Sequence, residues 1–381
     1  RRRSHKMASM LPASSRPPRS LADTGENLIS QVTDPSPGAA RKVAVVVIDG
    51  LGSQQLAAHS GHARFLHRHF QDSGEERYSG LPSTTASALV SITTGATPGQ
   101  HGLLGYQVRD PKSGHVVNHL KPFPAGVAAS TWQPVPTVFE QAAERGIPAL
   151  AFCEERFRGT DFTEATLRGA DLRGVEKLPD HLHQLRSFFD EVDAGFAYLY
   201  WPAVDRMGHQ HGVDSDQWRD AVEAVDAFCA ELAGALTPGE AVTVTADHGM
   251  LDVADAERFV FSATHPLRAD VALWAGEPRC VHLYLHEGVE SGRWAGMFQE
   301  TLGHGFRVRT RTQLLEAGIF GAVSPENEPR IGDVVAFAEG RSSLYDEQTA
   351  SSSSLAMRGQ HGSFSDAEIR VPHIPLHEAG S

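Results

Sequence analysis

The alternation of short apolar runs with helical patterns is the feature that most constrains the fold of this chain. The run Lys42–Ile48 is rich in valine and ends at Asp49-Gly50, which is typical of a strand buried on both faces of a parallel sheet. Similar runs recur at 147–153, 196–201, 241–246, 281–285 and 334–338. Helical patterns lie between several of them, at 54–70, 137–145, 181–191, 216–236 and 293–302. This order predicts an α/β fold, a three-layer sandwich around a central, largely parallel sheet.

The chain is predicted to consist of a lead and one long domain. Residues 1–40 are rich in Arg, Ser, Pro and Gly, which predicts a flexible N-terminal lead. Residues 41–381 are expected to form a single catalytic domain with small insertions at about 106–190 and 251–330. Segment 164–174 resembles a few pentapeptide repeats, too few for a stacked core, and is expected to be a surface turn. The serine run at 351–354 predicts a mobile loop that covers the functional site.

The charge and cysteine content exclude several classes of protein. A net charge of −13 argues against binding to a nucleic-acid polymer or an anionic membrane, because both need a basic face. No continuous apolar stretch of the sequence is long enough to span a membrane. Cys153, Cys229 and Cys280 lack CxxC spacing, so we expect neither a disulfide framework nor a cysteine-ligated zinc site, and a reducing, cytoplasmic location fits best. No secretory signal is visible, although trimming could have removed one. The oligomeric state is open.

Acidic residues and histidines follow the predicted strands. Asp49 comes directly after 42–48, Asp205 shortly after 196–201, and Asp247-His248 directly after 241–246. Ligands of parallel α/β sheets bind outside the carboxyl ends of the strands. The three carboxylates are therefore predicted to share one rim of the sheet.

The spacing of these residues suits a metal site. Asp205 and His209 are four residues apart, on one side of a helical turn, and His361 stands in a Gly-Gln-His-Gly segment. The chain has 20 histidines, and imidazole suits zinc. Each residue also has an ordinary explanation: Asp49 as a helix cap, Asp247-His248 as a turn, and His361 as a solvated loop residue. Their joint occurrence on one rim favours metal binding, and a metal would let an acidic protein receive an anionic substrate.

The stretch at 81–95, LPSTTASALVSITTG, is predicted to carry the chemistry. Pro82 and Ser83 suit a turn and helix entry, and apolar residues follow at helical spacing up to Gly95. Thr84 and Thr85 then lie at a helix N-terminus, where free N–H groups and the helix dipole favour an anion. The ordinary alternative is that the threonines only cap the helix.

Together these motifs resemble a known family. They are Asp49, P-S-T-T-A followed by T-T-G-x-x-P-G-x-H-G at 93–102, D-x-x-G-H-x-x-G at 205–212, A-D-H-G-M at 246–250 and G-x-H-G at 359–362. Their order from residue 42 to the C-terminus resembles the alkaline phosphatase superfamily, and within it the type I phosphodiesterase/nucleotide pyrophosphatase family. The C/S-x-P-x-R motif of the sulfatase branch is absent from this loop.

The resemblance implies two zinc ions and a threonine nucleophile. One zinc ion would be held by Asp49, Asp247, His248 and the nucleophile. The other would be held by Asp205, His209 and His361. Counting back ten residues from Gly95, as the family pattern suggests, aligns the nucleophile with Thr85, and Thr84 is the alternative. Threonine is a poor nucleophile until it is ionised by a metal. A backbone N–H near Ala86 would help to hold a non-bridging phosphoryl oxygen.

The resemblance implies a hydrolase of phosphodiester or phosphoanhydride bonds, acting on a small anionic, phosphate-containing substrate that could be a nucleotide. Ala88 replaces an asparagine that many nucleotide pyrophosphatases have three residues after the nucleophile, so another group must act as donor and nucleotide preference does not carry over. A phosphomonoesterase or phosphonate hydrolase is the alternative, and a non-enzymatic metal-binding protein on the same scaffold is a third. Aromatic residues that could stack on a substrate are Tyr106, Phe157, Phe162 and Trp201. Cationic residues that would favour a monoester are Lys121, Arg158, Arg168 and Arg206.

Overall fold

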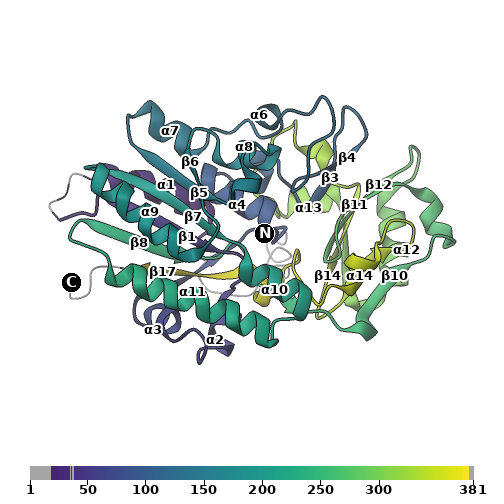
Figure 1. Cartoon of the computed structure of the whole chain (residues 1–381). Coiled ribbons are helices and arrows are strands. Elements are labelled where there is room, and N and C mark those ends of the chain that lie inside the picture. The colour runs from purple at the N-terminus through teal and green to yellow at the C-terminus, as the bar shows by residue number, and fades with distance from the viewer. Residues whose placement is uncertain (1–18, 35, 37, 377–381) are drawn as a thin grey trace, which may run out of the picture.

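A computed structural model describes residues 19–376, apart from residues 35 and 37. Its centre is a seven-stranded sheet of order β2-β17-β8-β1-β7-β5-β6 (Figure 1). β1 runs parallel to β7 and β8, and β5 runs parallel to β6 and β7, whereas β17 is antiparallel to β2 and β8. The strands are β1 Lys42–Ile48, β2 Glu75–Tyr78, β5 Ala149–Cys153, β6 Asp171–Gly174, β7 Gly195–Trp201, β8 Glu240–Thr245 and β17 Arg370–Leu376. The predicted α/β fold with a largely parallel sheet is confirmed.

Helices cover this sheet and bury its strands (Figure 1). One group of helices, which contact one another, is α1 Ala22–Thr33, α4 Thr85–Thr94 and α7 Val138–Glu144. A second group is α2 Ser53–Ala58, α3 Arg64–Ser73, α9 Leu178–Glu191 and α11 Asp216–Gly234. Every residue of β1 after Lys42 is buried, which explains its continuous apolar sequence. The predicted helix at 54–70 is two helices, because the chain turns at 59–63.

A second, antiparallel sheet lies to the right in Figure 1 and has the order β11-β12-β14-β13. Its strands are β11 Val271–Glu277, β12 Cys280–Leu285, β13 Phe306–Thr310 and β14 Val334–Ala338. α12 Ser291–Leu302 packs on β13, and Trp294 and Phe298 fill a separate core. The runs at 281–285 and 334–338 are strands as predicted, but they belong to this sheet and not to the central one.

Shorter elements complete the fold. The two-stranded pairs are β3 Gln107–Arg109 with β4 Val116–Asn118, β9 Leu251–Asp252 with β16 Gly359–Gln360, and β10 Arg258–Phe261 with β15 Ser343–Asp346. The remaining α-helices are α5 Pro98–His101, α6 Ala129–Trp132, α8 Asp161–Leu167, α10 Ala203–His211, α13 Arg311–Glu316, α14 Ser352–Ala356 and α15 Asp366–Ile369. None of the helices in the described ranges is both long and apolar enough to cross a bilayer.

Three boundary predictions differ from the structure. The segment expected to be an insertion at about 106–190 supplies β5 and β6 to the central sheet. Segment 164–174, expected to be a surface turn, spans the end of α8 and the edge strand β6. The serine run at 351–354 begins α14, where the Ser351 hydroxyl caps the helix, so it is not simply a loop.

The N-terminal lead is only partly as expected. Residues 1–18, 35 and 37 of the predicted flexible segment 1–40 lie outside the described residues. Residues 22–33 form α1, whose side chains Leu28 and Val32 are buried against the rest of the protein. Gly25 allows a close approach to α4, because a Cβ there would lie 2.1 Å from the carbonyl oxygen of Ile92. The prediction of flexibility was wrong for this helix, which packs as an amphipathic element.

Candidate active site

The three acids lie at the carboxyl edge of neighbouring strands, as predicted. Asp49 directly follows β1, Asp247 lies two residues after the end of β8, and Asp205 lies in the first turn of α10, which starts two residues after β7. β1 lies between β7 and β8 in the sheet, so the three segments are adjacent. The backbone N–H of Asp205 donates to the carbonyl of Asp49 at 3.0 Å, which joins two of these segments directly.

His248 presents a ring nitrogen to a group of oxygen atoms. Its Nδ1 is 2.9 Å from the carbonyl oxygen of Gly249, which can only accept, so Nδ1 carries the proton. Nε2 is therefore the ring nitrogen that is available to a metal ion. It lies 3.0 Å from Thr85 Oγ1, 3.3 Å from Asp49 Oδ1 and 3.4 Å from Asp247 Oδ2.

His209 and His361 face each other in the same way. Nδ1 of His209 donates to the carbonyl of Gly359 at 2.7 Å, and Nδ1 of His361 donates to the carbonyl of Ser83 at 2.8 Å. The two Nε2 atoms are 3.3 Å apart. Asp205 Oδ1 lies 3.3 Å from the first and 3.7 Å from the second. Two imidazole nitrogens and a carboxylate oxygen that converge in this way suit a metal ion between them.

The buried charges of the site also fit metal binding. Asp49 Oδ1, Asp205 Oδ1 and Asp247 Oδ2 are buried and have no hydrogen-bond partner among the residues that the structure describes. Burial and the neighbouring carboxylates raise the pKa of Asp49 and of Asp247, and burial lowers the pKa of His361. A divalent cation would offset this repulsion. In two groups of residues the possible ligand atoms all lie within 4.8 Å of one another. One group is Asp49, Asp247 and His248, and the other is Asp205, His248 and His361.

Thr85 lies at an open helix N-terminus. α4 begins at Thr85, and Thr84 is the N-cap residue in extended conformation, but its side chain makes no capping bond. The explanation that these threonines only cap the helix is therefore not supported. The first-turn N–H groups, including that of Ala86, have no acceptor within the helix and suit an anion. Gly95 ends the helix, as predicted, and it adopts the left-handed conformation.

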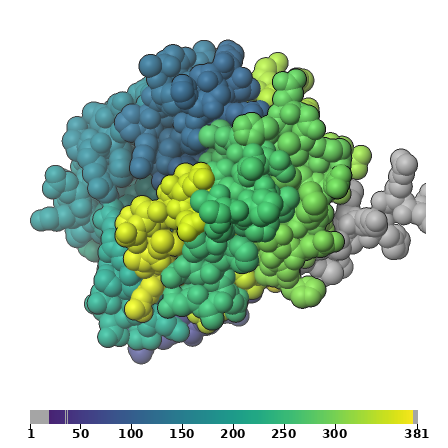
Figure 2. Space-filling model, turned by 90° about the vertical axis from the view of Figure 1, so that its right-hand side faces the viewer, coloured from purple at the N-terminus to yellow at the C-terminus, as the bar shows by residue number. Residues whose placement is uncertain are grey.

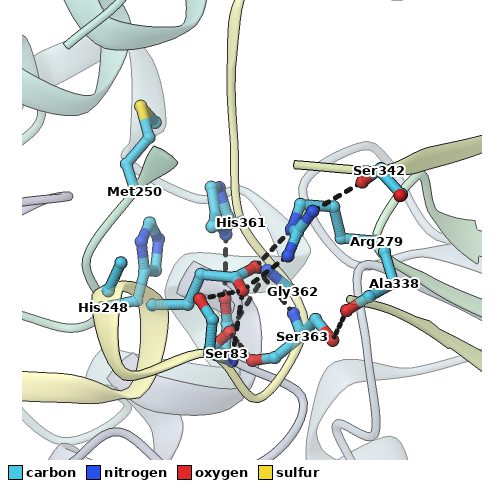
Figure 3. Close-up of polar contacts among 12 residues, drawn as sticks. Ser83, His248, Met250, Arg279, Ala338, Ser342, His361, Gly362 and Ser363 are labelled. Atoms are coloured by element: carbon cyan, nitrogen blue, oxygen red, sulfur yellow. Dashed lines mark hydrogen bonds and ion pairs between the residues drawn. The ribbon is translucent and has the colours of Figure 1, made fainter. Parts of the chain in front are cut away.

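A buried ion pair helps to hold together the segments that carry Ser83 and His361 (Figure 3). Arg279 Nε and Nη2 donate to Glu368 Oε1 and Oε2 at 2.7 and 2.9 Å, and both side chains are fully buried. Glu368 Oε1 also accepts from the N–H of Ser363 at 3.0 Å. The Ser83 hydroxyl donates to the carbonyl of Ser363 at 2.6 Å, which ties the segment before Thr85 to the segment after His361.

Breaking this ion pair is expected to destabilise the protein strongly. Arg279→Met leaves the buried Glu368 carboxylate without its counter-charge, and such a loss costs about 3–5 kcal/mol. Urea denaturation should show this decrease in the free energy of unfolding, while the exposed control Arg145→Met should change it by less than about 0.5 kcal/mol. The double variant Arg279→Met/Glu368→Met should recover part of the loss. An Arg279→Met protein as stable as the control would show that the pair contributes little.

A cavity of about 1080 Å³ opens beside Thr85. Its lining includes Asp49, Asp205, His209 and His361 on the polar side, and Leu89, Phe157, Phe162 and Met357 on the apolar side. Residues of α14 also line it, and Figure 2 shows the C-terminal segment in yellow between the teal-blue and the green surfaces. The cavity therefore offers room and apolar surface next to the candidate metal ligands.

Some proposed substrate contacts lie elsewhere. Tyr106, Phe157, Phe162, Lys121 and Arg206 line the cavity. The prediction for Trp201 was wrong, because successive residues of a strand face opposite sides and its ring packs against His181 at 5.6 Å. Arg158 pairs with Glu155, and Arg168 pairs with Glu140, so neither is a free cation for substrate.

Two residues at the site were not found from the sequence. Tyr200 precedes Trp201 and lines the cavity, and its hydroxyl group donates a hydrogen bond to Asp49 Oδ2. The alternation of β7 could have indicated this side chain in place of Trp201. Glu277, at the end of β11, also lines the cavity. No local signal marked it, because it comes from the second sheet.

Comparisons with known proteins agree with this geometry. The type I phosphodiesterase/nucleotide pyrophosphatase family profile matches residues 43–364. No curated protein sequence shows significant similarity to the chain. Among solved structures, murine ectonucleotide pyrophosphatase/phosphodiesterase 5 is 17% identical, with 88% of each chain covered and a TM-score of 0.68. Phosphonoacetate hydrolase from Sinorhizobium meliloti 1021, in complex with phosphonoacetate, is 19% identical, with 90% of this chain and 91% of that chain covered and a TM-score of 0.69.

These structural similarities establish an alkaline phosphatase-like fold. The family profile extends over most of the chain and includes the segments that carry Asp49, Thr85, Asp205, Asp247 and His361. The chain belongs to the type I phosphodiesterase/nucleotide pyrophosphatase family.

Proposed function

We propose that the chain is a di-zinc hydrolase that cleaves phosphodiester or phosphoanhydride bonds by attack of Thr85 on phosphorus. The single observation that carries this proposal is the position of Thr85 Oγ1, at an open helix N-terminus and 3.0 Å from Nε2 of His248. A hydroxyl in this position adjoins both an anion-binding helix end and the candidate metal ligands.

The donor set fits two zinc ions. Asp49, Asp247 and His248, with Thr85, would hold one ion, and Asp205, His209 and His361 would hold the other. Bound zinc would favour the ionised threonine hydroxyl and neutralise phosphate charge. Tyr200 keeps Asp49 oriented through its hydroxyl, and the carbonyls of Gly249, Gly359 and Ser83 orient the three imidazoles.

The chain's own groups then act in sequence. Thr85 Oγ1 forms a bond to phosphorus while the bond to the alcohol or phosphate leaving group breaks. The N–H of Ala86 donates to a non-bridging oxygen at the helix N-terminus. Water then cleaves the phosphothreonine, which releases the phosphoryl product and returns Thr85. The inactive threonine-to-alanine variant of murine ectonucleotide pyrophosphatase/phosphodiesterase 5 has been solved in complex with AMP, which supports a threonine nucleophile and a nucleotide-sized substrate here.

A phosphonate hydrolase or phosphomonoesterase on the same site is the second candidate. The similarity to phosphonoacetate hydrolase favours it, as do Lys121 and Arg206 in the cavity lining, because cations stabilise an additional negative charge. Arg206, however, is paired with Glu154 at 3.1 Å. Metal ligands indicate the mechanism but do not determine which leaving group is released, so activity measurements must distinguish the two candidate functions.

Substrate preference tests the proposed function. We expect kcat/KM for bis-p-nitrophenyl phosphate to exceed that for p-nitrophenyl phosphate by at least about tenfold, because the cavity gives a second ester group apolar surface. Phosphonoacetate is assayed in parallel by phosphate release. A monoester preference greater than tenfold, or faster turnover of phosphonoacetate, would favour the second candidate.

A further inference from the structure

Two exposed apolar side chains lie at the mouth of the cavity beside Thr85, where the mouth is the exposed part of its lining. Leu120 is 45% exposed and Met357 is 37% exposed, and both line the cavity. Across the described residues, the other large apolar side chains with comparable exposure are Val260 and Met297, which lie outside the cavity lining. Single exposed apolar side chains are common on protein surfaces, but two beside one cavity indicate apolar contents.

Backbone hydrogen bonds hold both of these side chains in place. The N–H of Leu120 donates to Asn118 Oδ1 at 3.0 Å, directly after β4. Met357 follows α14, and the N–H of the next residue, Arg358, donates to the carbonyl of His209 at 2.9 Å. The second side chain is therefore tied to a proposed zinc ligand. A substrate can pack against such fixed positions without first ordering a free loop.

The deep end of the cavity is apolar as well. Leu89 follows Thr85 by four residues on α4, so the two lie on one face of the helix, one turn apart. Phe152 of β5 and Leu167 of α8 also line the cavity, although both side chains are buried. Apolar surface is therefore available one helical turn from the nucleophile and again at the mouth.

The threonine hydroxyls of the cavity wall at α8 are already engaged. Thr160 Oγ1 donates to Thr163 Oγ1 at 3.0 Å, and Thr163 Oγ1 donates to the carbonyl of Phe157 at 2.7 Å. Thr166 Oγ1 donates to the carbonyl of Phe162 at 2.7 Å. A nucleoside carries several hydroxyl, carbonyl and ring-nitrogen groups, each of which loses water on burial and needs a new partner. This wall therefore suits a group with few polar atoms.

We propose that the cavity binds the alkyl chain, or another weakly polar ester group, of an amphiphilic phosphodiester. Leu89 contacts the inner end of this group, and Leu120 and Met357 contact its outer end. The substrate class rests on the proposed function, which places the phosphate at Thr85. A volume of about 1080 Å³ leaves room for such a group beside the phosphate. Each methylene group that enters the cavity should strengthen binding about threefold to fourfold.

A series of diesters with one leaving group tests this substrate class. Methyl, butyl and octyl p-nitrophenyl phosphate all release p-nitrophenolate and differ only in the second ester group. Full-length, zinc-loaded protein is assayed below the concentration at which the octyl ester forms micelles. We expect kcat/KM to rise with chain length and to be at least about tenfold higher for the octyl ester than for the methyl ester, because two or three buried methylene groups suffice. Thymidine 5′-p-nitrophenyl phosphate should have a lower kcat/KM than the octyl ester.

Substitutions at the mouth test which residues select the chain. Leu120→Gln and Met357→Gln should each lower the octyl-to-methyl ratio of kcat/KM at least about threefold, because the outer part of the chain loses an apolar contact. Met297→Gln is the matched control, since Met297 is 36% exposed but lies on α12, outside the cavity lining. This control should leave the ratio within about 1.5-fold of wild type. The melting temperature should be the same for all four proteins, because exposed substitutions rarely change stability.

Several results would overturn this substrate class. An octyl-to-methyl ratio below tenfold, or a higher kcat/KM for the thymidine ester than for the octyl ester, would show that the cavity does not select an apolar ester group. A decrease in the ratio for Met297→Gln as large as that for Met357→Gln would show that the mouth is not the cause. A wild-type protein that turns over none of the diesters would instead remove the proposed function, and this inference with it.

Discussion

Replacing Thr85 with alanine is expected to lower kcat by at least about 10⁴-fold, because no other group can form the covalent intermediate and catalysis falls to what binding alone provides. The substitution removes a hydroxyl at the cavity wall and a single contact to His248, so the fold and the bound metal should be retained. Activity is measured with bis-p-nitrophenyl phosphate, metal content by elemental analysis, and folding by circular dichroism.

Two other threonines of this region serve as controls for the Thr85→Ala result. Thr93→Ala, in the same helix, removes a hydroxyl that bonds only to carbonyl groups of its own helix and should leave kcat within about threefold of wild type. Thr84→Ala tests the alternative nucleophile. A large loss for Thr84→Ala with activity retained in Thr85→Ala would move the nucleophile by one residue. Activity retained in both would point to direct attack by water.

Removing metal is expected to have an effect of similar size. Dialysis against a strong chelator should lower activity by at least about 10³-fold, since the ionised hydroxyl and the neutralisation of phosphate charge both depend on the cation. Added zinc should restore activity better than magnesium, because three imidazoles belong to the donor set and magnesium prefers oxygen ligands. The apo protein should also melt at a lower temperature, because a ligand that binds only the folded state stabilises it.

The control for metal removal is dialysis against the same chelator saturated with zinc. Asp205→Ala and His209→Ala remove ligands of one proposed ion and should lower both zinc content and activity. His211→Ala, two residues from His209, should leave both unchanged, because His211 is outside the proposed donor set. Activity that survives complete chelation would contradict a metal-dependent mechanism.

The strands that build the central sheet could mostly be predicted because they are continuous apolar runs. β1, β5, β7 and β8 all lie where the sequence indicates them. β17 was not predicted, since Pro372 and Pro375 interrupt its pattern and proline is unusual inside a sheet. The sheet to which β12 and β14 belong could not be predicted, because an apolar run specifies a strand but not its partner.

More of the candidate site than of the fold could be predicted from the sequence. Asp49, Asp205, Asp247 and His248 come together because strand order in a parallel sheet places strand ends on one edge. His361 joins them from the segment after β16, which lies outside that sheet. Side-chain direction was the weaker part of the prediction. Trp201 was chosen where Tyr200 faces the site, and Glu277 could not be found, because its position depends on how the second sheet packs against the first.

The central claim is that six protein donors seat two zinc ions beside Thr85, and anomalous X-ray diffraction at the zinc absorption edge tests it most directly. The account predicts two anomalous peaks in crystals of the zinc-loaded protein. One should lie within about 2.3 Å of donor atoms of Asp49, Asp247 and His248, and the other within the same distance of donor atoms of Asp205, His209 and His361. Thr85 Oγ1 should adjoin the first peak. The absence of peaks, or peaks bound by other residues, would contradict the claim.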